Sequence, residues 1–350
     1  MLDVSALMKK IAILSVCATL LAWNSSGVLA AEGYSVPLTE WGHPDIQGVW
    51  NFSSDVPMER PEEFGSRQFL TAQEIAATRS RPLRIGRADG VRRTSSGIEA
   101  FYNDTIWMEN VRKEGDIRTS HIIFPLNGQI PPRVSGVEHL PGGSGRIDGQ
   151  RPVRFSVGGI GRDGPEDRGL SERCLVGFNA GPQLMPSVYN NNVQIIQNRD
   201  YVVIMTEMIH DARIVKLENS EIATPWLDPR LKLWSGDSRG YWDGETLVVV
   251  TANFNGLTQS FEGYGTSESK ILTERFTRLG PTAIDYEFTI EDNATFTEKL
   301  SAVVPVTRVD AQLFEYACHE GNYGMGNMLR AARRREAEQV SDSVADIFRR

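Results

Sequence analysis

The pattern of hydrophobic and polar positions changes near residue 150. From there to residue 318, short runs rich in β-branched residues alternate with turn residues, which is typical of β-strands. Because so few residues separate the runs, crossover helices cannot join them, and an antiparallel meander is expected rather than a parallel sheet. The runs are NNVQIIQ, YVVIMTEM, ARIVKL, TLVVVTANF, ILTERFTRL, AIDYEFTIE and KLSAVVPVTRV.

Three turn sequences punctuate this pattern. NRD (198–200), WDGE (242–245) and RLGPTA (278–283) are each able to reverse the chain between two strands. We therefore predict an all-β fold at residues 151–327, in which a meander forms a closed or nearly closed barrel; a sandwich is the alternative.

The flanking regions have other patterns. Residues 31–150 are rich in Pro, Gly and Arg, which predicts a loop-rich region packed on the barrel. Its one credible helix start is LTAQEIAATRSR, where Thr71 and Glu74 have capping-box spacing. The last residues, 328–350, predict a charged helix that caps or trails the barrel.

The N-terminus has the order of a secretory signal. Lys9 and Lys10 precede the apolar run IAILSVCATLLAW and the small-residue segment NSSGVLAAEG, which predicts a signal peptide over residues 1–30 with cleavage near Ala30. The apolar run is too short to span a membrane. A periplasmic or secreted location follows.

Charge and cysteine content narrow the function further. The net charge of −8 argues against a nucleic-acid partner. Beyond the signal peptide two cysteines remain, Cys174 and Cys318. In an oxidising compartment they are expected to form a disulfide, which would stabilise the fold by about 3–5 kcal/mol. A reactive thiol is the alternative.

Two resemblances bear on the fold. In HPDIQGVWNF (43–52), Gly48 and Trp50 resemble the G-x-W signature of lipocalins, in which the tryptophan plugs one end of a calycin-like barrel; alternatively, Trp50 is an ordinary core aromatic. A second resemblance, to a family of uncharacterised exported proteins of Gram-negative bacteria, covers nearly the whole mature chain. It implies a periplasmic protein and transfers no catalytic residue. Its blocks are ERPEEF, RCLVGFNAGPQLMPSVYNNNVQIIQ, EMIHDARIV, WSGDSRGYWDGETLVVVTANF, ERFTR and YACHEGNY.

A first polar cluster lies in the apolar stretch 185–215. Read as one strand, YVVIMTEMIHDARIV places Glu207 and Asp211 on one face and His210 on the other, unless a bulge near His210 changes the register. A histidine beside carboxylates transfers protons near neutral pH, so these three are candidate catalytic residues. Arg213 is a candidate ligand for a carboxylate or an enolate-like charge.

The triple asparagine of the same stretch supplies amide donors and acceptors that would orient a substrate. Alternatively, the asparagines build a turn, and Asp211 pairs with Arg213 as a structural ion pair at a strand end. The candidate substrate-binding residues here are Tyr189, Asn190, Asn191, Asn192 and Arg213.

Two further clusters extend the candidate site. In CHEGNY (318–323), His319 and Glu320 are candidate catalytic residues and Tyr323 is a candidate substrate-binding residue. The disulfide would hold this loop near GFNAGP (177–182) and so preorganise a site. Alternatively, the disulfide only fastens the end of the chain. In WSGDSRGYWDG (234–244), aromatic faces beside charges suit sugars or polycyclic ligands. Its candidate substrate-binding residues are Trp234, Asp237 and Arg239, and the alternative is a loop ion pair beside core tryptophans.

Other chemistry is disfavoured. GIGRDG (159–164) matches G-x-G-x-x-G, but no helix is predicted to begin beside it. A zinc site made from His210, His319, Glu320 and Asp211 lacks the local spacing of metal motifs, so no metal and no cofactor are expected.

The sequence therefore favours a periplasmic enzyme that uses acid–base chemistry, of the lyase, hydratase or isomerase type, on a small organic molecule. A lipocalin-like binding protein without catalysis is the alternative, and an envelope structural protein is a third. The oligomeric state is not predicted.

Overall fold

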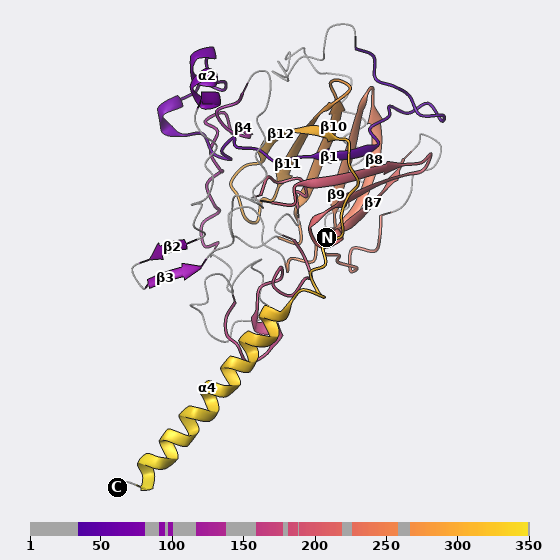
Figure 1. Ribbon diagram of the computed structural model, residues 1–350. Helices are drawn as coiled ribbons and strands as arrows, with labels where there is room; N and C mark the ends of the chain where they lie inside the picture. The colour runs from indigo at the N-terminus through magenta and orange to yellow at the C-terminus, as the bar shows by residue number, and fades with distance from the viewer. Residues whose placement is uncertain are drawn as a thin grey trace.

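The computed structural model describes residues 34–80, 91–94, 97–100, 117–137, 159–177, 181–187, 189–218, 226–257 and 267–348. The predicted signal peptide lies outside these residues. The chain forms a β-barrel followed by a long helix (Figure 1), so the predicted all-β barrel fold with a C-terminal helix is confirmed.

Nine strands form the barrel, a short strand extends it, and a separate hairpin lies apart from it. The barrel strands are β1 (Gly48–Asn51), β5 (Asn192–Gln197), β6 (Tyr201–Thr206), β7 (Ala212–Leu217), β8 (Asp237–Asp243), β9 (Thr246–Ala252), β10 (Ile271–Arg278), β11 (Ala283–Glu291) and β12 (Leu300–Val309). The short strand is β4 (Ile122–Phe124), and β2 (Val91–Thr94) pairs with β3 (Gly97–Ala100) in the hairpin. The helices are α2 (Ala72–Ser80) and α4 (Tyr323–Phe348), with single 3-10 turns η2 (Glu62–Phe64), η3 (Pro165–Asp167) and η4 (Met208–His210).

The barrel closes because β1, which comes first of the barrel strands along the chain, pairs with the last strand. Val49 lies opposite Val309 on β12, and the other edge of β1 pairs with β5. All neighbouring barrel strands are antiparallel except β7 and β8, which share a short parallel pairing. The expected antiparallel meander thus holds for most of the barrel, with one parallel step where residues 219–236 join the two strands.

The three predicted turns connect hairpins. Residues 198–200 join β5 to β6, residues 244–245 join β8 to β9, and residues 279–282 join β10 to β11. Along β10 and β11 every second side chain is buried, because alternate residues point into the barrel.

Trp50 is buried near the end of the barrel where β10 and β12 stop. Its side chain is fully buried, its Nε1 donates a hydrogen bond to the Ile46 carbonyl at 3.0 Å, and the guanidinium carbons of Arg278 and Arg308 lie 5.8 and 5.5 Å from its ring centroid. Gly48 has a φ of +133°, and a Cβ there would meet the Arg308 guanidinium at 2.9 Å. The G-x-W spacing therefore has a physical cause, because the arginine crosses the glycine to reach the indole.

Segments of the N-terminal region cover the outside of the barrel. The strand β4 extends the sheet beside β12, and the His121 ring nitrogen Nδ1 lies 2.7 Å from the Val303 carbonyl oxygen. The strands β1 and β4 both come from residues 31–150, so this region supplies barrel strands as well as loops.

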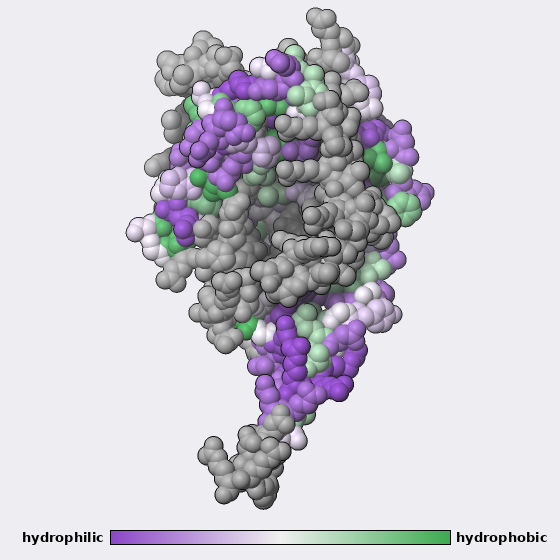
Figure 2. All heavy atoms as spheres, turned by 60° about the vertical axis from the view of Figure 1, so that its left-hand side comes forward, coloured by the Kyte–Doolittle hydropathy of each residue, from purple (hydrophilic) through white to green (hydrophobic). Residues whose placement is uncertain are grey.

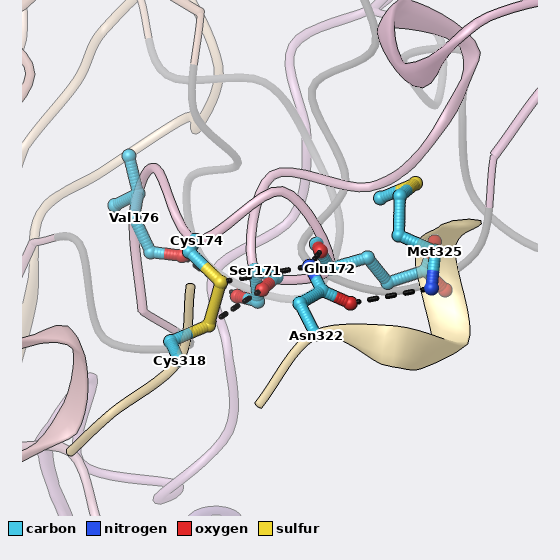
Figure 3. Close-up of a disulfide and its surroundings, with 7 residues drawn as sticks. All are labelled: Ser171, Glu172, Cys174, Val176, Cys318, Asn322 and Met325. Atoms are coloured by element: carbon cyan, nitrogen blue, oxygen red, sulfur yellow. Dashed lines mark hydrogen bonds between the residues drawn. A yellow bond between two sulfur atoms is a disulfide. The ribbon is translucent and has the colours of Figure 1, made fainter. Parts of the chain in front are cut away.

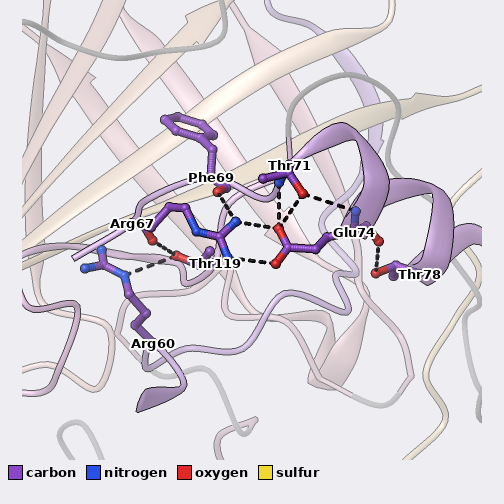
Figure 4. Close-up of polar contacts among 7 residues, drawn as sticks. All are labelled: Arg60, Arg67, Phe69, Thr71, Glu74, Thr78 and Thr119. Carbon is purple, nitrogen blue, oxygen red and sulfur yellow. Dashed lines mark hydrogen bonds and ion pairs between the residues drawn. The ribbon is translucent and has the colours of Figure 1, made fainter. Parts of the chain in front are cut away.

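The predicted capping box at the start of α2 is confirmed (Figure 4). The Thr71 backbone N–H donates to Glu74 Oε2 at 2.7 Å, and the Glu74 backbone N–H donates to Thr71 Oγ1 at 3.3 Å. Arg67 forms an ion pair with the same carboxylate. Hydrogen bonds from Arg67 and then from Thr71 lower the pKa of Glu74 to about 2.

The helix α4 projects away from the barrel (Figure 1), and the surface where it leaves is mainly hydrophilic (Figure 2). Asn322 caps its first turn through a 3.3 Å bond from the Met325 backbone N–H. Arg333 donates hydrogen bonds to the carbonyls of Asp163 and Arg162, which joins the helix to the loop that precedes η3. Within the described ranges, no helix combines the length and apolar character needed to cross a lipid bilayer.

We predict that Trp50→Ala destabilises the protein by about 3–5 kcal/mol, because it removes a fully buried ring and leaves a cavity near one end of the barrel. Urea unfolding of the variant measures the loss. Leu38→Ala serves as the control, since Leu38 is 65% exposed and its removal should change the free energy of unfolding by less than about 0.5 kcal/mol. Equal losses in the two variants would contradict a core role for Trp50.

Candidate functional site

Most of the polar residues that the sequence singles out lie at one end of the barrel. Because neighbouring strands alternate in direction, β5, β7, β8 and β10 begin at the end where β6 stops. We call this end, opposite Trp50, the polar end. The residues at or next to it are Asn191, Asn192, Glu207, His210, Asp211, Arg213, Asp237 and Lys270.

The runs YVVIMTEM and ARIVKL form two separate strands, so the alternation counted through residues 201–215 as one strand does not hold where the chain turns at the polar end. The strand β6 ends at Thr206 and β7 begins at Ala212, with Ile209 and His210 at positive φ in the η4 turn between them. His210 is exposed, and Asp211 accepts a hydrogen bond from Ser235 Oγ at 2.9 Å. Both residues lie at the rim, and their catalytic role stays a prediction.

Glu207 is buried in a chain of amide contacts. Asn192 Nδ2 donates to Glu207 Oε2 at 2.8 Å, and Asn51 Nδ2 donates to Asn192 Oδ1 at 2.9 Å. These side chains join the ends of β1, β5 and β6.

The other asparagines shape the backbone before β5. Asn191 accepts from the Ser187 N–H at 2.7 Å and donates to the Ser187 carbonyl at 2.9 Å, and Asn190 has a φ of +56°. These contacts agree with the turn-building alternative. Tyr189 packs against the disulfide cluster.

Arg213 points into the barrel, where it forms a two-bond ion pair with Glu274 rather than with Asp211. Tyr286 OH donates to Glu274 Oε1 at 2.7 Å, and Arg213 Nη1 donates to Thr251 Oγ1 at 3.2 Å. Burial lowers the pKa of Arg213, but the Glu274 carboxylate outweighs that effect and the net pKa is raised. Burial, reinforced by the same carboxylate, raises the pKa of Tyr286 well above its usual range.

Lys270 is a second buried charge at the polar end. It is 1% exposed, its Nζ donates to the Gly181 carbonyl at 3.2 Å, and it lies 4.0 Å from the Phe254 ring centroid. Burial lowers its pKa to about 8, although Asp292 and Glu274 oppose this. Within the described residues, Asp292 Oδ1 is buried without a hydrogen-bond partner.

Sequence reasoning missed the interior residues, although the pattern contained a signal for two of them. Strict alternation in ILTERFTR puts Glu274 on the buried face with Leu272 and Phe276, and Tyr286 sits between Ile284 and Phe288 in the same way. A charge at an inward position of a strand indicates a paired or functional group.

The predicted disulfide is confirmed, and Figure 3 shows its surroundings. The Cys174–Cys318 bridge packs against Met208 and Ile209 of the η4 turn, which brings the second cluster next to the first. Asn322 Nδ2 donates to the Glu172 carbonyl at 2.7 Å. The candidate residues beside the bridge, His319, Glu320 and Tyr323, are all exposed.

The third cluster lies on the outer face of the barrel. Arg239 forms an ion pair with Asp237 at 2.5 Å and stacks over Trp226 at 5.2 Å, and the Leu227 N–H donates to Asp237 at 2.9 Å. This arrangement agrees with the loop ion-pair alternative. Trp234 is half-buried in the loop before β8.

In the part of the chain that the structure describes, no three His, Cys, Asp or Glu side chains are placed to hold a metal ion. His210, His319, Glu320 and Asp211 therefore do not form the mixed zinc site considered as an alternative.

No family model, curated protein or solved structure matches this chain. The closed barrel with its C-terminal helix agrees with a calycin-like fold in outline. Such a barrel could bind a small ligand, and the disulfide is consistent with an oxidising extracytoplasmic compartment.

The burial of Lys270 predicts a pH-dependent stability. With a pKa of about 8 in the folded state and 10.5 in the unfolded chain, the unfolded state binds more protons between these values. The free energy of unfolding therefore rises with pH across this window, by about 3 kcal/mol in total.

Urea unfolding of the wild type and of Lys270→Met at pH 7 to 10.5 measures how the free energy of unfolding of each protein depends on pH. We expect the variant to be the more stable protein at pH 7 and to lose that advantage as the pH rises through the window. Parallel pH profiles for the two proteins would show that Lys270 titrates normally.

Proposed function

We propose that this protein is an extracytoplasmic enzyme that transfers protons to or from a small organic molecule bound at the polar end of the barrel. The reaction is of the lyase, hydratase or isomerase type. The observation that supports it most is the buried set of Arg213, Glu274 and Tyr286, which lies among the apolar residues of the barrel core.

The energetic argument starts from the cost of burying charges. Taking an arginine and a carboxylate out of water costs several kcal/mol for each ion, so a buried ion pair is often no more stabilising than apolar residues of the same volume. Keeping such a pair in the core therefore calls for a second reason, and substrate recognition with proton transfer supplies one.

The three groups have complementary roles in such a reaction. Arg213 has a buried Nε without a partner among the described residues, and its charge would stabilise an enolate-like oxygen. Glu274 would accept a carbon-bound proton, and Tyr286, which already donates to Glu274, would fix the position of that carboxylate.

A lipocalin-like binding protein is the second candidate. It is favoured by Trp50, which is buried near the end of the barrel where β10 and β12 stop and leaves the polar end as the side from which a ligand would enter. Retention of a ligand without any proton exchange would favour this candidate over the enzyme.

The paired replacement Arg213→Met with Glu274→Leu separates function from stability. We expect either single variant to lose about 3–5 kcal/mol because it leaves one charge buried and unpaired, and the double variant to lose less, about 1–3 kcal/mol, because it leaves only the Tyr286 hydroxyl without its acceptor. Urea unfolding measures these values.

The same double variant should lose activity. The assay follows, by NMR, the exchange of carbon-bound protons for deuterium in a panel of small ketones, aldehydes and organic acids in D2O, together with native mass spectrometry for a retained ligand. Arg275→Met is the matched control, since Arg275 neighbours Glu274 but pairs with Asp243 on the outer face. A folded double variant with full exchange would refute the proposed site.

His210→Ala tests the rim residue. If His210 passes protons between the site and solvent, exchange should fall by at least about tenfold, while the melting temperature stays unchanged because the side chain is exposed. Unchanged exchange would confine the chemistry to the interior groups.

A further inference from the structure

Lys270 occupies a position that differs from that of an ordinary surface lysine. Its side chain is 1% exposed, and it enters the polar end from the residue before β10. The groups nearest its Nζ are the Gly181 carbonyl, at 3.2 Å, and the face of Phe254, whose ring centroid is 4.0 Å away. Gly181 has no side chain, so the amine is covered there by backbone of a loop and not by the sheet.

The Lys270 amine has hydrogen-bond donors that are not used within the described residues. An ammonium has three N–H donors, and among the described residues Lys270 uses one of them, toward Gly181. Asp292 lies opposite Lys270 across the β10–β11 pairing, next to the Ile271–Glu291 pair, and is also 1% exposed. Its Oδ2 accepts from Ser267 and Thr295, whereas its Oδ1 has no partner within the described chain.

The surroundings favour the neutral amine. Burial is the main cause that lowers the pKa of Lys270 to about 8, and the nearby Arg213 charge acts in the same direction. A desolvated lysine beside another cation is a known way to obtain a nucleophilic amine near neutral pH. The aromatic face of Phe254 adds to the apolar surroundings.

We propose that Lys270 is a nucleophile that forms an imine with the carbonyl carbon of an aldehyde or ketone bound at the polar end. This inference rests on the proposed function and names its substrate class. It also gives a role to Asp292, whose unpaired oxygen faces the same end of the barrel.

The step balances without a cofactor. The neutral Nζ attacks the carbonyl carbon to form a carbinolamine, the carbon–oxygen bond then breaks, and the oxygen leaves as water with one hydrogen from the amine and one proton taken from solvent, which leaves a protonated imine. Nothing is oxidised or reduced. Asp292 would carry protons between nitrogen and oxygen, and the protonated imine would draw electrons from the adjacent carbon, which eases loss of a proton to Glu274.

Reductive trapping tests the inference. Mature protein is incubated at pH 7 with pyruvate or benzaldehyde as the probe and with sodium cyanoborohydride, which reduces an imine to a stable secondary amine, and the modified lysines are mapped by peptide mass spectrometry. We expect Lys270 to be labelled on the order of 100-fold faster than a lysine that titrates near 10.5, because far more of it is neutral at pH 7.

Lys299 and Lys232 provide internal comparisons, since both lie outside the barrel core. Lys270→Arg keeps the charge but removes the nucleophile, so it should lose both the label and the deuterium exchange. The labelling rate of Lys270 should also level off above about pH 8.

The outcomes separate the inference from the proposed function. Deuterium exchange that persists in Lys270→Arg, or labelling that favours surface lysines, overturns the imine and leaves the enzyme proposal standing. Selective labelling of Lys270 without exchange of any substrate supports the reactive amine and refutes the enzyme. Neither labelling nor exchange refutes both.

Discussion

The pairing of β1 with β12 is the constraint on which the rest of the structure depends. It joins residues 49–51 to residues 307–309, so the nine strands form a closed wall with no free edge between them. In β10 and β11 the inward residues of this wall are buried and alternate with less buried outward residues. The same pairing brings Trp50 opposite Arg308, near the end of the barrel where β10 and β12 stop.

Closure of the barrel therefore determines which charged side chains are buried in its interior. Asp237 and Arg239 pair with each other beneath the loop that carries Trp226 and are also buried, whereas Arg213, Glu274 and Lys270 are buried inside the barrel. The first two inward charges compensate each other through a two-bond ion pair with Tyr286 as a third member. Lys270 and Asp292 are not matched in this way, and the cost of burying them is offset less completely.

The sequence predicts those parts of the fold that depend on local pattern. Hairpin turns, strand alternation, the Thr71–Glu74 cap and the disulfide all follow from residue types at short spacing or from the count of two cysteines. The site was harder to predict because its members come from distant strands. The pairing of Arg213 with Glu274 requires β7 and β10 to face each other across the barrel, and strand order is not encoded in any local pattern.

The turn at residues 207–211 also depends on a tertiary contact that local sequence does not reveal. Its apolar residues, Met208 and Ile209, read as a continuing strand, but they are buried because they pack against the Cys174–Cys318 bridge. A tertiary contact thus explains two hydrophobic residues that the alternating pattern assigns to a strand. The turn also points His210 outward. The chemistry predicted for that histidine therefore belongs to the rim of the barrel, whereas the groups shielded from water are those that the closed wall has buried.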